Sequence, residues 1–198
     1  MKVYGDIRSG NCYKIKLLAT LLDIDHEWIT VDVLSGETRS PAFLAKNPNG
    51  KIPLLELDDG RCLAESNAIL NYLAAGSDLI PADNYDHALV LQWQFFEQYS
   101  HEPYIAVARF IEKFLGLPAE RRHEYESKQA GGHKALSVME LQLAKTPYLV
   151  GKQLTTADIS LYGYTHVAHE GGFDLAGYPA INAWLERIRS LPEYVPME

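Results

Sequence analysis

Cysteine is scarce in this chain, and long hydrophobic runs are absent. The 198 residues include two cysteines, Cys12 and Cys62, which are too few for the disulfide framework of a small secreted domain and are typical of a reducing compartment. No apolar stretch approaches the roughly 20 residues that cross a bilayer, and the N-terminal segment has no signal-like apolar region. We therefore expect a protein without a membrane partner, located in the cytoplasm.

Basic residues and metal-binding residues are also few. Lys and Arg number 18 against 26 Asp and Glu, which gives a formal net charge of −8 and a pI near 5.4. Because phosphate backbones are bound by clustered Lys and Arg, this composition argues against a nucleic-acid partner. His166 and His169 stand three residues apart beside Glu170, but no fourth ligand is evident, so we expect no metal.

The most informative stretch that is present covers residues 47–55, Asn-Pro-Asn-Gly-Lys-Ile-Pro-Leu-Leu. Gly50 and Pro53 punctuate a loop before an apolar run, so Ile52 and Pro53 stand where a loop becomes a strand. Pro suits the first residue of a strand because it cannot donate to the ladder. A cis bond before Pro53 would leave the main-chain N–H and C=O of Ile52 facing outward. An extended peptide can pair with such groups as an added strand.

A second motif, Glu65-Ser66, follows ten residues after this stretch. It opens a helical pattern with apolar residues on one face at Ile69, Leu70 and Leu73. Main-chain N–H groups and a Ser hydroxyl at a helix N-terminus bind a carboxylate, while Glu65 can pair with an ammonium group. Taken alone, the motif also fits an ordinary helix cap.

Together the two motifs predict a binding site for one ligand. That ligand has a peptide bond in its middle and an α-amino-acid head at Glu65 and Ser66. A carboxylate at its other end would lie within reach of Lys51, and Arg39 can assist from the preceding loop. Glutathione fits this description.

In these residues the chain resembles the cytosolic glutathione transferase family, over essentially its whole length. By that resemblance, the family's main-chain pair before a cis-proline maps onto Ile52 and Pro53, and its Glu/Gln-Ser pair maps onto Glu65 and Ser66. The resemblance implies a homodimer that uses glutathione as co-substrate. It also implies conjugation of glutathione to electrophilic, mostly apolar small molecules, as in detoxification.

The expected elements divide the chain into two parts. In the first part strands and helices alternate, which predicts an α/β domain, and the resemblance makes it thioredoxin-like. Its elements are expected at residues 2–4, 12–23, 27–32, 40–45, 53–57, 61–64 and 67–75. We assign residues 1–77 to a glutathione-binding domain, residues 78–84 to a linker, and residues 85–198 to an all-helical domain with the co-substrate pocket and the dimer contacts.

The prediction of a helical part depends on long segments with helical hydrophobic periodicity. They are expected at residues 87–115, 120–144, 156–168 and 179–191. Pro103 should kink the first of them, a common device where a helix lines a cleft. Thr155 and Asp158 form a capping box for the third, a recurrent stability signature of the family by resemblance.

The chemistry is expected in the loop after the first strand, residues 6–14. Lowering a thiol pKa by about 2 units from about 8.5 needs roughly 2.7 kcal/mol, which one or two hydrogen bonds to the thiolate supply. Ser9 and Asn11 are suitable donors beside a helix N-terminus. By resemblance, Ser9 falls on the activating serine of theta-like transferases, and Asn11 on the asparagine of Ser/Thr-x-Asn bacterial transferases such as the Nu-like group.

Several alternatives stay open. Ser9 can be only a helix cap, and Cys12 at a helix N-terminus can be a reactive thiolate, whereas Cys62 in an apolar strand is expected to be inert core. An aromatic group beside the expected kink can face the co-substrate: Tyr99, Tyr104 and Phe110. His101 is a weaker candidate. The rival activities are a glutathione-dependent disulfide reductase or peroxidase of the same fold and a non-catalytic assembly module.

Overall fold

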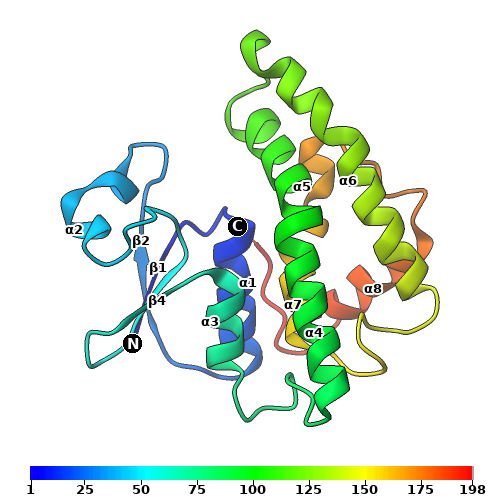
Figure 1. The fold of residues 1–198 in the computed structure, drawn as a ribbon, viewed down its shortest axis with the longest axis horizontal. Coiled ribbons are helices and arrows are strands. Elements are labelled where there is room, and N and C mark those ends of the chain that lie inside the picture. The colour runs from blue at the N-terminus through cyan, green and yellow to red at the C-terminus, as the bar shows by residue number, and fades with distance from the viewer. Residues whose placement is uncertain (198) are drawn as a thin grey trace. The chain divides into compact units, whose positions relative to one another are not determined.

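The structure is a computed structural model, and it describes residues 1–197. The chain separates into two compact units (Figure 1). The first comprises Met1–Ser77 with the segment that begins at Pro192, and the second comprises Asp78–Leu191. Within residues 1–197, no helix combines the length and the apolar character that a membrane span requires.

The first unit is an α/β domain of thioredoxin-like type. Its mixed sheet has the strand order β2-β1-β3-β4. The strands are β1 (Lys2–Gly5), β2 (Glu27–Thr30), β3 (Leu54–Glu56) and β4 (Cys62–Ala64). The helices are α1 (Gly10–Leu21), the short α2 (Pro41–Leu44) and α3 (Ser66–Leu73), with a 3-10 turn at Glu37–Arg39. The fold class and the order of elements expected from the sequence are confirmed.

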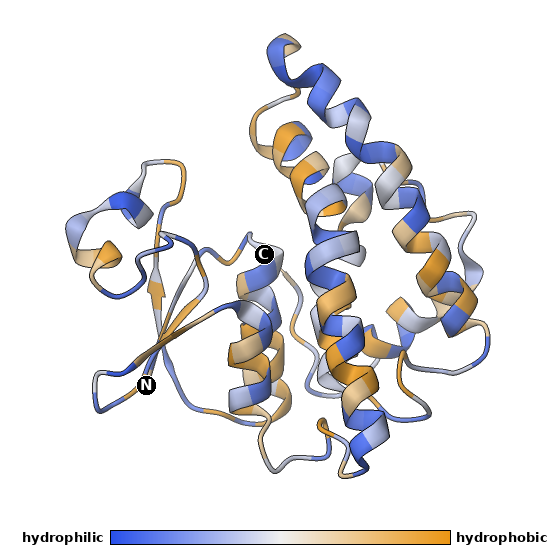
Figure 2. Ribbon diagram, in the orientation of Figure 1, coloured by the Kyte–Doolittle hydropathy of each residue, from blue (hydrophilic) through white to orange (hydrophobic). Residues whose placement is uncertain are grey.

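Alternation along β1 places its side chains on two different layers. Val3 is buried, and a Cβ at Gly5 would lie 2.9 Å from the Cys12 sulfur, so this face of β1 lies against α1. Tyr4 points to the opposite face, where its ring meets the Phe43 ring of α2 edge-on with the centroids 6.4 Å apart. Figure 1 shows α1 and α3 together on one side of the sheet and α2 on the other, and Figure 2 shows apolar residues on both α1 and α3.

The second unit is all helical. Its helices are α4 (Asn84–Phe96), α5 (Glu102–Arg109), α6 (Arg122–Leu143), α7 (Thr156–Thr165) and α8 (Pro179–Arg189). Two π-helical turns, Glu97–His101 and Phe110–Phe114, follow α4 and α5, and 3-10 turns cover Ala119–Arg121 and Ala168–Gly171. The expected interruption therefore takes the form of a π turn immediately before α5, whose second residue is Pro103. Such turns recur at functional sites.

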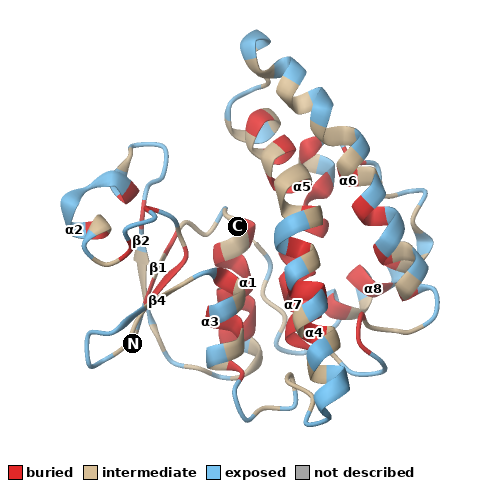
Figure 3. Cartoon of the chain, in the orientation of Figure 1, coloured by how far each residue is buried: buried red, intermediate tan, exposed pale blue. Residues whose placement is uncertain are grey.

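Helix α7 is the centre of this unit, because every residue from Thr156 to Thr165 is buried (Figure 3). The capping box at its start is confirmed. Asp158 accepts hydrogen bonds from the main-chain N–H and the hydroxyl of Thr155, both at 2.9 Å. It also accepts from the Leu149 N–H at 2.9 Å and from Trp184 Nε1 at 3.0 Å, so one carboxyl group joins α7, α8 and the preceding loop.

Two adjacent glycines allow α6 to approach its neighbours closely. A Cβ at Gly131 would lie 2.2 Å from a ring carbon of Tyr104 on α5. A Cβ at Gly132 would lie 2.2 Å from a ring carbon of Phe173. Both rings thus pack onto the bare helix backbone, which compensates for the unfavourable helix propensity of glycine.

Candidate functional site

The strand register gathers the predicted glutathione residues at one edge of the sheet. Strands β1 and β4 each pair antiparallel with β3, so they run in the same direction. Each is followed by a helix, α1 or α3, and the two helices therefore begin at the same edge. Leu54, the first residue of β3, lies opposite both Tyr4 and Ala64, which brings the loop that ends at Pro53 to that edge as well. Three segments far apart in sequence meet there.

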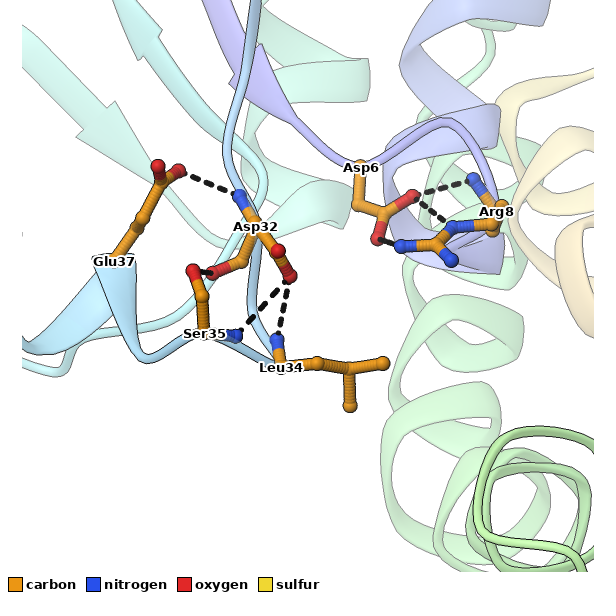
Figure 4. A network of polar contacts seen from close by, with 6 residues as sticks. All are labelled: Asp6, Arg8, Asp32, Leu34, Ser35 and Glu37. Atoms are coloured by element: carbon orange, nitrogen blue, oxygen red, sulfur yellow. Dashed lines mark hydrogen bonds and ion pairs between the residues drawn. The ribbon is translucent and has the colours of Figure 1, made fainter.

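A carboxylate clamp orders the loop that leads to Ser9. Asp6 accepts hydrogen bonds from the Arg8 N–H at 2.9 Å and from Arg8 Nε at 3.0 Å, and it pairs with the guanidinium at 2.7 Å (Figure 4). This ion pair raises the pKa of Arg8. Across the loop, Asp32 accepts hydrogen bonds from the Leu34 N–H at 2.9 Å and the Ser35 N–H at 3.2 Å. The contacts between Asp6 and Arg8 thus order the turn immediately before Ser9.

Ser9 stands at the N-cap position of α1. Its main chain is extended, with φ −80° and ψ 125°, and its side chain makes no cap hydrogen bond. Its main-chain N–H donates to the Asp6 carbonyl at 2.9 Å, and its own carbonyl accepts from the Tyr13 N–H at 2.8 Å. The hydroxyl is therefore not used to begin the helix, and Ser9 remains a candidate donor to a thiolate.

Asn11 is joined to the start of α3 through a lysine that sequence reasoning missed. Its Oδ1 accepts from Lys14 Nζ at 2.8 Å and from the Ser66 hydroxyl at 3.2 Å. Lys14 Nζ also reaches Ser66 Oγ at 3.4 Å. Lys14 is fully buried, which is rare for lysine. The spacing of three residues from Asn11 was the available sequence signal, because residues three apart on a helix are neighbours.

The loop before β3 is shaped by Asn47. Its side-chain amide donates to the Lys51 carbonyl at 2.7 Å and accepts from the Asn49 N–H at 3.1 Å. Gly50 has φ +62°, and a Cβ there would lie 2.8 Å from a guanidinium nitrogen of Arg39. Glycine is therefore needed both for the turn and for the close approach of Arg39. Lys51 is exposed, so two cations border this loop.

The Ile52–Pro53 peptide bond is cis. Within residues 1–197, the main-chain N–H and C=O of Ile52 make no hydrogen bond, and the residue is half-exposed. Glu65, at the start of α3, has φ +69°, a conformation that is costly for a residue with a Cβ. Its side chain is exposed, and Ser66 behind it is 5% exposed. Strained residues of this kind persist only where the surrounding structure enforces them, and they cluster at ligand sites.

The two cysteines lie in different environments. Cys12 is fully buried, and burial raises its pKa to about 12, although a hydrogen bond with the Ser9 side chain opposes the rise. A fully buried thiol with a raised pKa is protonated at neutral pH, which argues against the alternative in which Cys12 is a reactive nucleophile. The expectation of a buried Cys62 is wrong, because β4 is an edge strand of the sheet and Cys62 is exposed.

The three aromatic residues suggested for a co-substrate lie in different environments within the helical unit. Tyr99 is 86% exposed, Tyr104 packs on Gly131 of α6, and the Phe110 ring stacks on the Phe114 ring at 5.9 Å. No ring contact joins the three within residues 1–197. His101 is buried, and its Nε2 lies 2.9 Å from the Thr165 hydroxyl. In the same range, His, Cys, Asp and Glu form no cluster of three suited to a metal ion.

Comparisons with known proteins identify the family of this chain. Residues 1–75 match the model of the glutathione S-transferase N-terminal domain, and residues 87–192 match that of the C-terminal domain. A crystal structure of a glutathione S-transferase from Pseudomonas fluorescens is 65% identical, with a TM-score of 0.98, covering 99% of this chain and 98% of that one.

Two further relatives carry the names of other activities. The disulfide-bond oxidoreductase YfcG of Escherichia coli is 31% identical over 92% of this chain and 87% of its own length. A maleylacetoacetate isomerase from Methylobacterium extorquens, crystallised with malonate and glutathione, is 27% identical over 98% of this chain and 94% of its own, with a TM-score of 0.83. The matches to both domains and across the whole chain show that this protein belongs to the glutathione S-transferase family.

Proposed function

We propose that this protein binds glutathione at the sheet edge where α1, α3 and the loop before β3 meet. The meeting of these three segments is the observation that carries the proposal. The Ile52 main chain pairs with the backbone of the cysteinyl residue of glutathione, as an added strand pairs with a sheet. The main-chain N–H groups at the start of α3, that of Ser66 included, receive the γ-glutamyl carboxylate, and Glu65 pairs with the ammonium group of the ligand. Lys51 receives the glycyl carboxylate, with Arg39 beside it.

Ser9 and Asn11 then stabilise the thiolate of the bound glutathione. At pH 7 only a few per cent of a thiol with a pKa of about 8.5 is ionised. A hydrogen bond to a charged acceptor contributes about 1.5–3 kcal/mol, so two donors account for a drop of about 2 units, which needs about 2.7 kcal/mol. The N-terminus of α1 adds a favourable dipole. The site therefore needs a donor and no general base.

The reaction that this arrangement supports is nucleophilic attack by the glutathione thiolate. The sulfur forms a bond to an electrophilic carbon of a mostly apolar small molecule, and the bond from that carbon to its leaving group breaks with both electrons. In this proposal residues 1–77 supply the thiolate and residues 78–84 connect the two domains. Residues 85–198 supply the groups that contact the co-substrate, with Tyr99, Tyr104 and Phe110 as candidates.

Reduction of disulfides is the second candidate activity. It is favoured by the similarity to the oxidoreductase of E. coli and by the Ser9-Gly10-Asn11 sequence, which offers two side-chain donors in one loop. Here the glutathione thiolate attacks one sulfur of a disulfide and the other sulfur leaves as a thiolate. A second glutathione then reduces the mixed disulfide, and oxidised glutathione is released. Exchange of this kind is also favoured by a thiol pKa near the ambient pH.

A cytoplasmic homodimer is part of the same proposal. Helix α4 and the π turn after it expose aromatic rings on one helical face, which supports a subunit contact: Tyr85 is 71% exposed, Phe95 71% and Tyr99 86%. Tyr99 is thus a candidate both for the subunit contact and for the contact with the co-substrate. Sedimentation of the wild type and of Phe95→Ser tests the contact, and we expect a dimer whose dissociation constant rises at least tenfold in the variant. A wild-type monomer would contradict this part of the proposal.

Calorimetry and two activity assays test the function. We expect glutathione to bind the wild type and Ser9→Ala with similar affinity, and turnover with 1-chloro-2,4-dinitrobenzene to fall at least tenfold in the variant. High activity on hydroxyethyl disulfide with little on the aromatic chloride would identify a reductase. Unchanged turnover in Ser9→Ala would remove Ser9 from the catalytic group. No binding of glutathione would favour a non-catalytic assembly module.

A further inference from the structure

Lys14 is a buried cation beside the proposed glutathione site and has no role in the mechanism above. It lies on α1 and is 0% exposed, and its ammonium group contacts the polar side chains of Asn11 and Ser66. Helices α1 and α3 lie side by side (Figure 1), and the ammonium group connects their first turns. Burying an ammonium group is costly unless hydrogen bonds compensate, so the position of Lys14 calls for an explanation.

The contact with Lys14 determines which way the Asn11 amide points. An ammonium group has three donors and no acceptor, so the Asn11 atom 2.8 Å from Nζ must be the carbonyl oxygen. The same oxygen accepts from the Ser66 hydroxyl at 3.2 Å. The NH2 group of the amide therefore lies on the opposite side. It makes no hydrogen bond within residues 1–197, and Asn11 is half-exposed.

We propose that Lys14 is a positioning residue that holds the Asn11 amide with its NH2 group toward the thiol of bound glutathione. This inference rests on the proposed function, in which Asn11 donates to the thiolate. Rotating the amide by a half turn would bring its NH2 group against the ammonium and the Ser66 hydroxyl. It would also present an oxygen to the thiolate. Lys14 excludes that orientation while remaining out of contact with solvent.

Ser66 takes part in the same arrangement. Its hydroxyl proton is directed to Asn11, and its oxygen faces the Lys14 ammonium. The γ-glutamyl carboxylate is therefore received mainly by main-chain N–H groups at the start of α3. One buried cation thus couples the thiol end of the site to its carboxylate end.

The test is a double-mutant cycle on the thiol pKa of bound glutathione. That pKa is measured from the thiolate absorbance as a function of pH at saturating glutathione. We expect Lys14→Met to raise that pKa by about 1 unit, close to the effect of Asn11→Ala, because one donor to the thiolate is lost in each. Lys14→Met should change little further in the Asn11→Ala background, since Lys14 acts through Asn11. Lys16→Met, two residues along α1, is the matched control and should leave the pKa unchanged.

Each outcome distinguishes the inference from the proposed function. If the wild type lowers the thiol pKa and Lys14→Met leaves it lowered, the positioning role is refuted while the transferase proposal stands. If Lys14→Met has the same effect with and without Asn11, the lysine acts as a charge and not as a positioning group. No lowering in the wild type would overturn both. Should Lys14→Met fail to fold, Lys14→Arg and Asn11→Asp replace it. Lys14→Arg keeps a cationic donor and should keep the low thiol pKa. Asn11→Asp keeps an acceptor for Lys14 but loses the NH2 group, so it should lose the low thiol pKa.

Discussion

Asp158 offers the most quantitative stability prediction, because one buried carboxyl group meets four donors. In Asp158→Ala, the Leu149 N–H and Trp184 Nε1–H would stay buried without an acceptor. Each such group costs about 1–3 kcal/mol, and loss of the helix cap at Thr155 costs about 0.5–2 kcal/mol. We therefore expect the free energy of unfolding to fall by about 4 kcal/mol. Asp158→Asn keeps one carbonyl oxygen and should lose about half as much.

The pH dependence of the same group has a definite sign. Burial raises the pKa of Asp158 from 3.8 to about 6, against the opposing effect of its hydrogen bonds. The folded state therefore holds a proton between these values that the unfolded state has released. Stability from this group is fully present below pH 4 and is lost as the pH rises through 6, which amounts to about 2–3 kcal/mol.

Urea unfolding of the wild type and Asp158→Asn at pH 4 and pH 7 measures this effect. The asparagine variant lacks the titration, so the stability difference between the two proteins should be about 2–3 kcal/mol larger at pH 4. Equal differences at the two pH values would show that hydrogen bonding balances burial at Asp158, and a larger difference at pH 7 would show that it outweighs burial. The estimate of 4 kcal/mol for the alanine variant would then be too low.

Three further predictions concern packing, thiol reactivity and backbone strain. Gly132→Ala should lower the free energy of unfolding by about 1–2 kcal/mol because its Cβ would overlap an aromatic ring, whereas Gly177→Ala, with open space around it, should change it by less than about 0.5 kcal/mol. Iodoacetamide at pH 7.5 should modify the exposed Cys62 but not Cys12 in the native protein, and both after denaturation, as mass spectrometry of the intact chain will show. Glu65→Gly should raise the unfolding free energy by about 1 kcal/mol by relieving its positive φ, while KM for glutathione rises about tenfold through loss of the ammonium pair.

Local signals in the sequence predicted much of the fold and the candidate site. The loop before Pro53, the helix start at Ser66 and the capping box at Thr155 each depend on residues close together in the chain. Turn and cap chemistry is decided within a few residues, so it can be read without tertiary contacts. The helix α4 begins earlier than expected, at Asn84, because Asp83 caps it and was assigned to the linker.

Properties that depend on tertiary context were missed. Lys14 was overlooked because lysine is an exposed residue by default, and only packing of α1 against α3 buries it. Cys62 was expected to be buried because its strand is apolar, but the strand order places β4 at an edge. The sequence showed that Pro103 interrupts a helix, yet the π turn before it depends on how the surrounding helices pack.

The most direct test of the central claim is the pKa of the glutathione thiol on the enzyme. Thiolate absorbance should be followed against pH at saturating glutathione for the wild type, Ser9→Ala and Asn11→Ala. We expect a thiol pKa about 2 units below the free value in the wild type, and a return of about 1 unit toward it in each variant. A wild-type pKa equal to that of free glutathione would contradict the claim that this site activates the thiol.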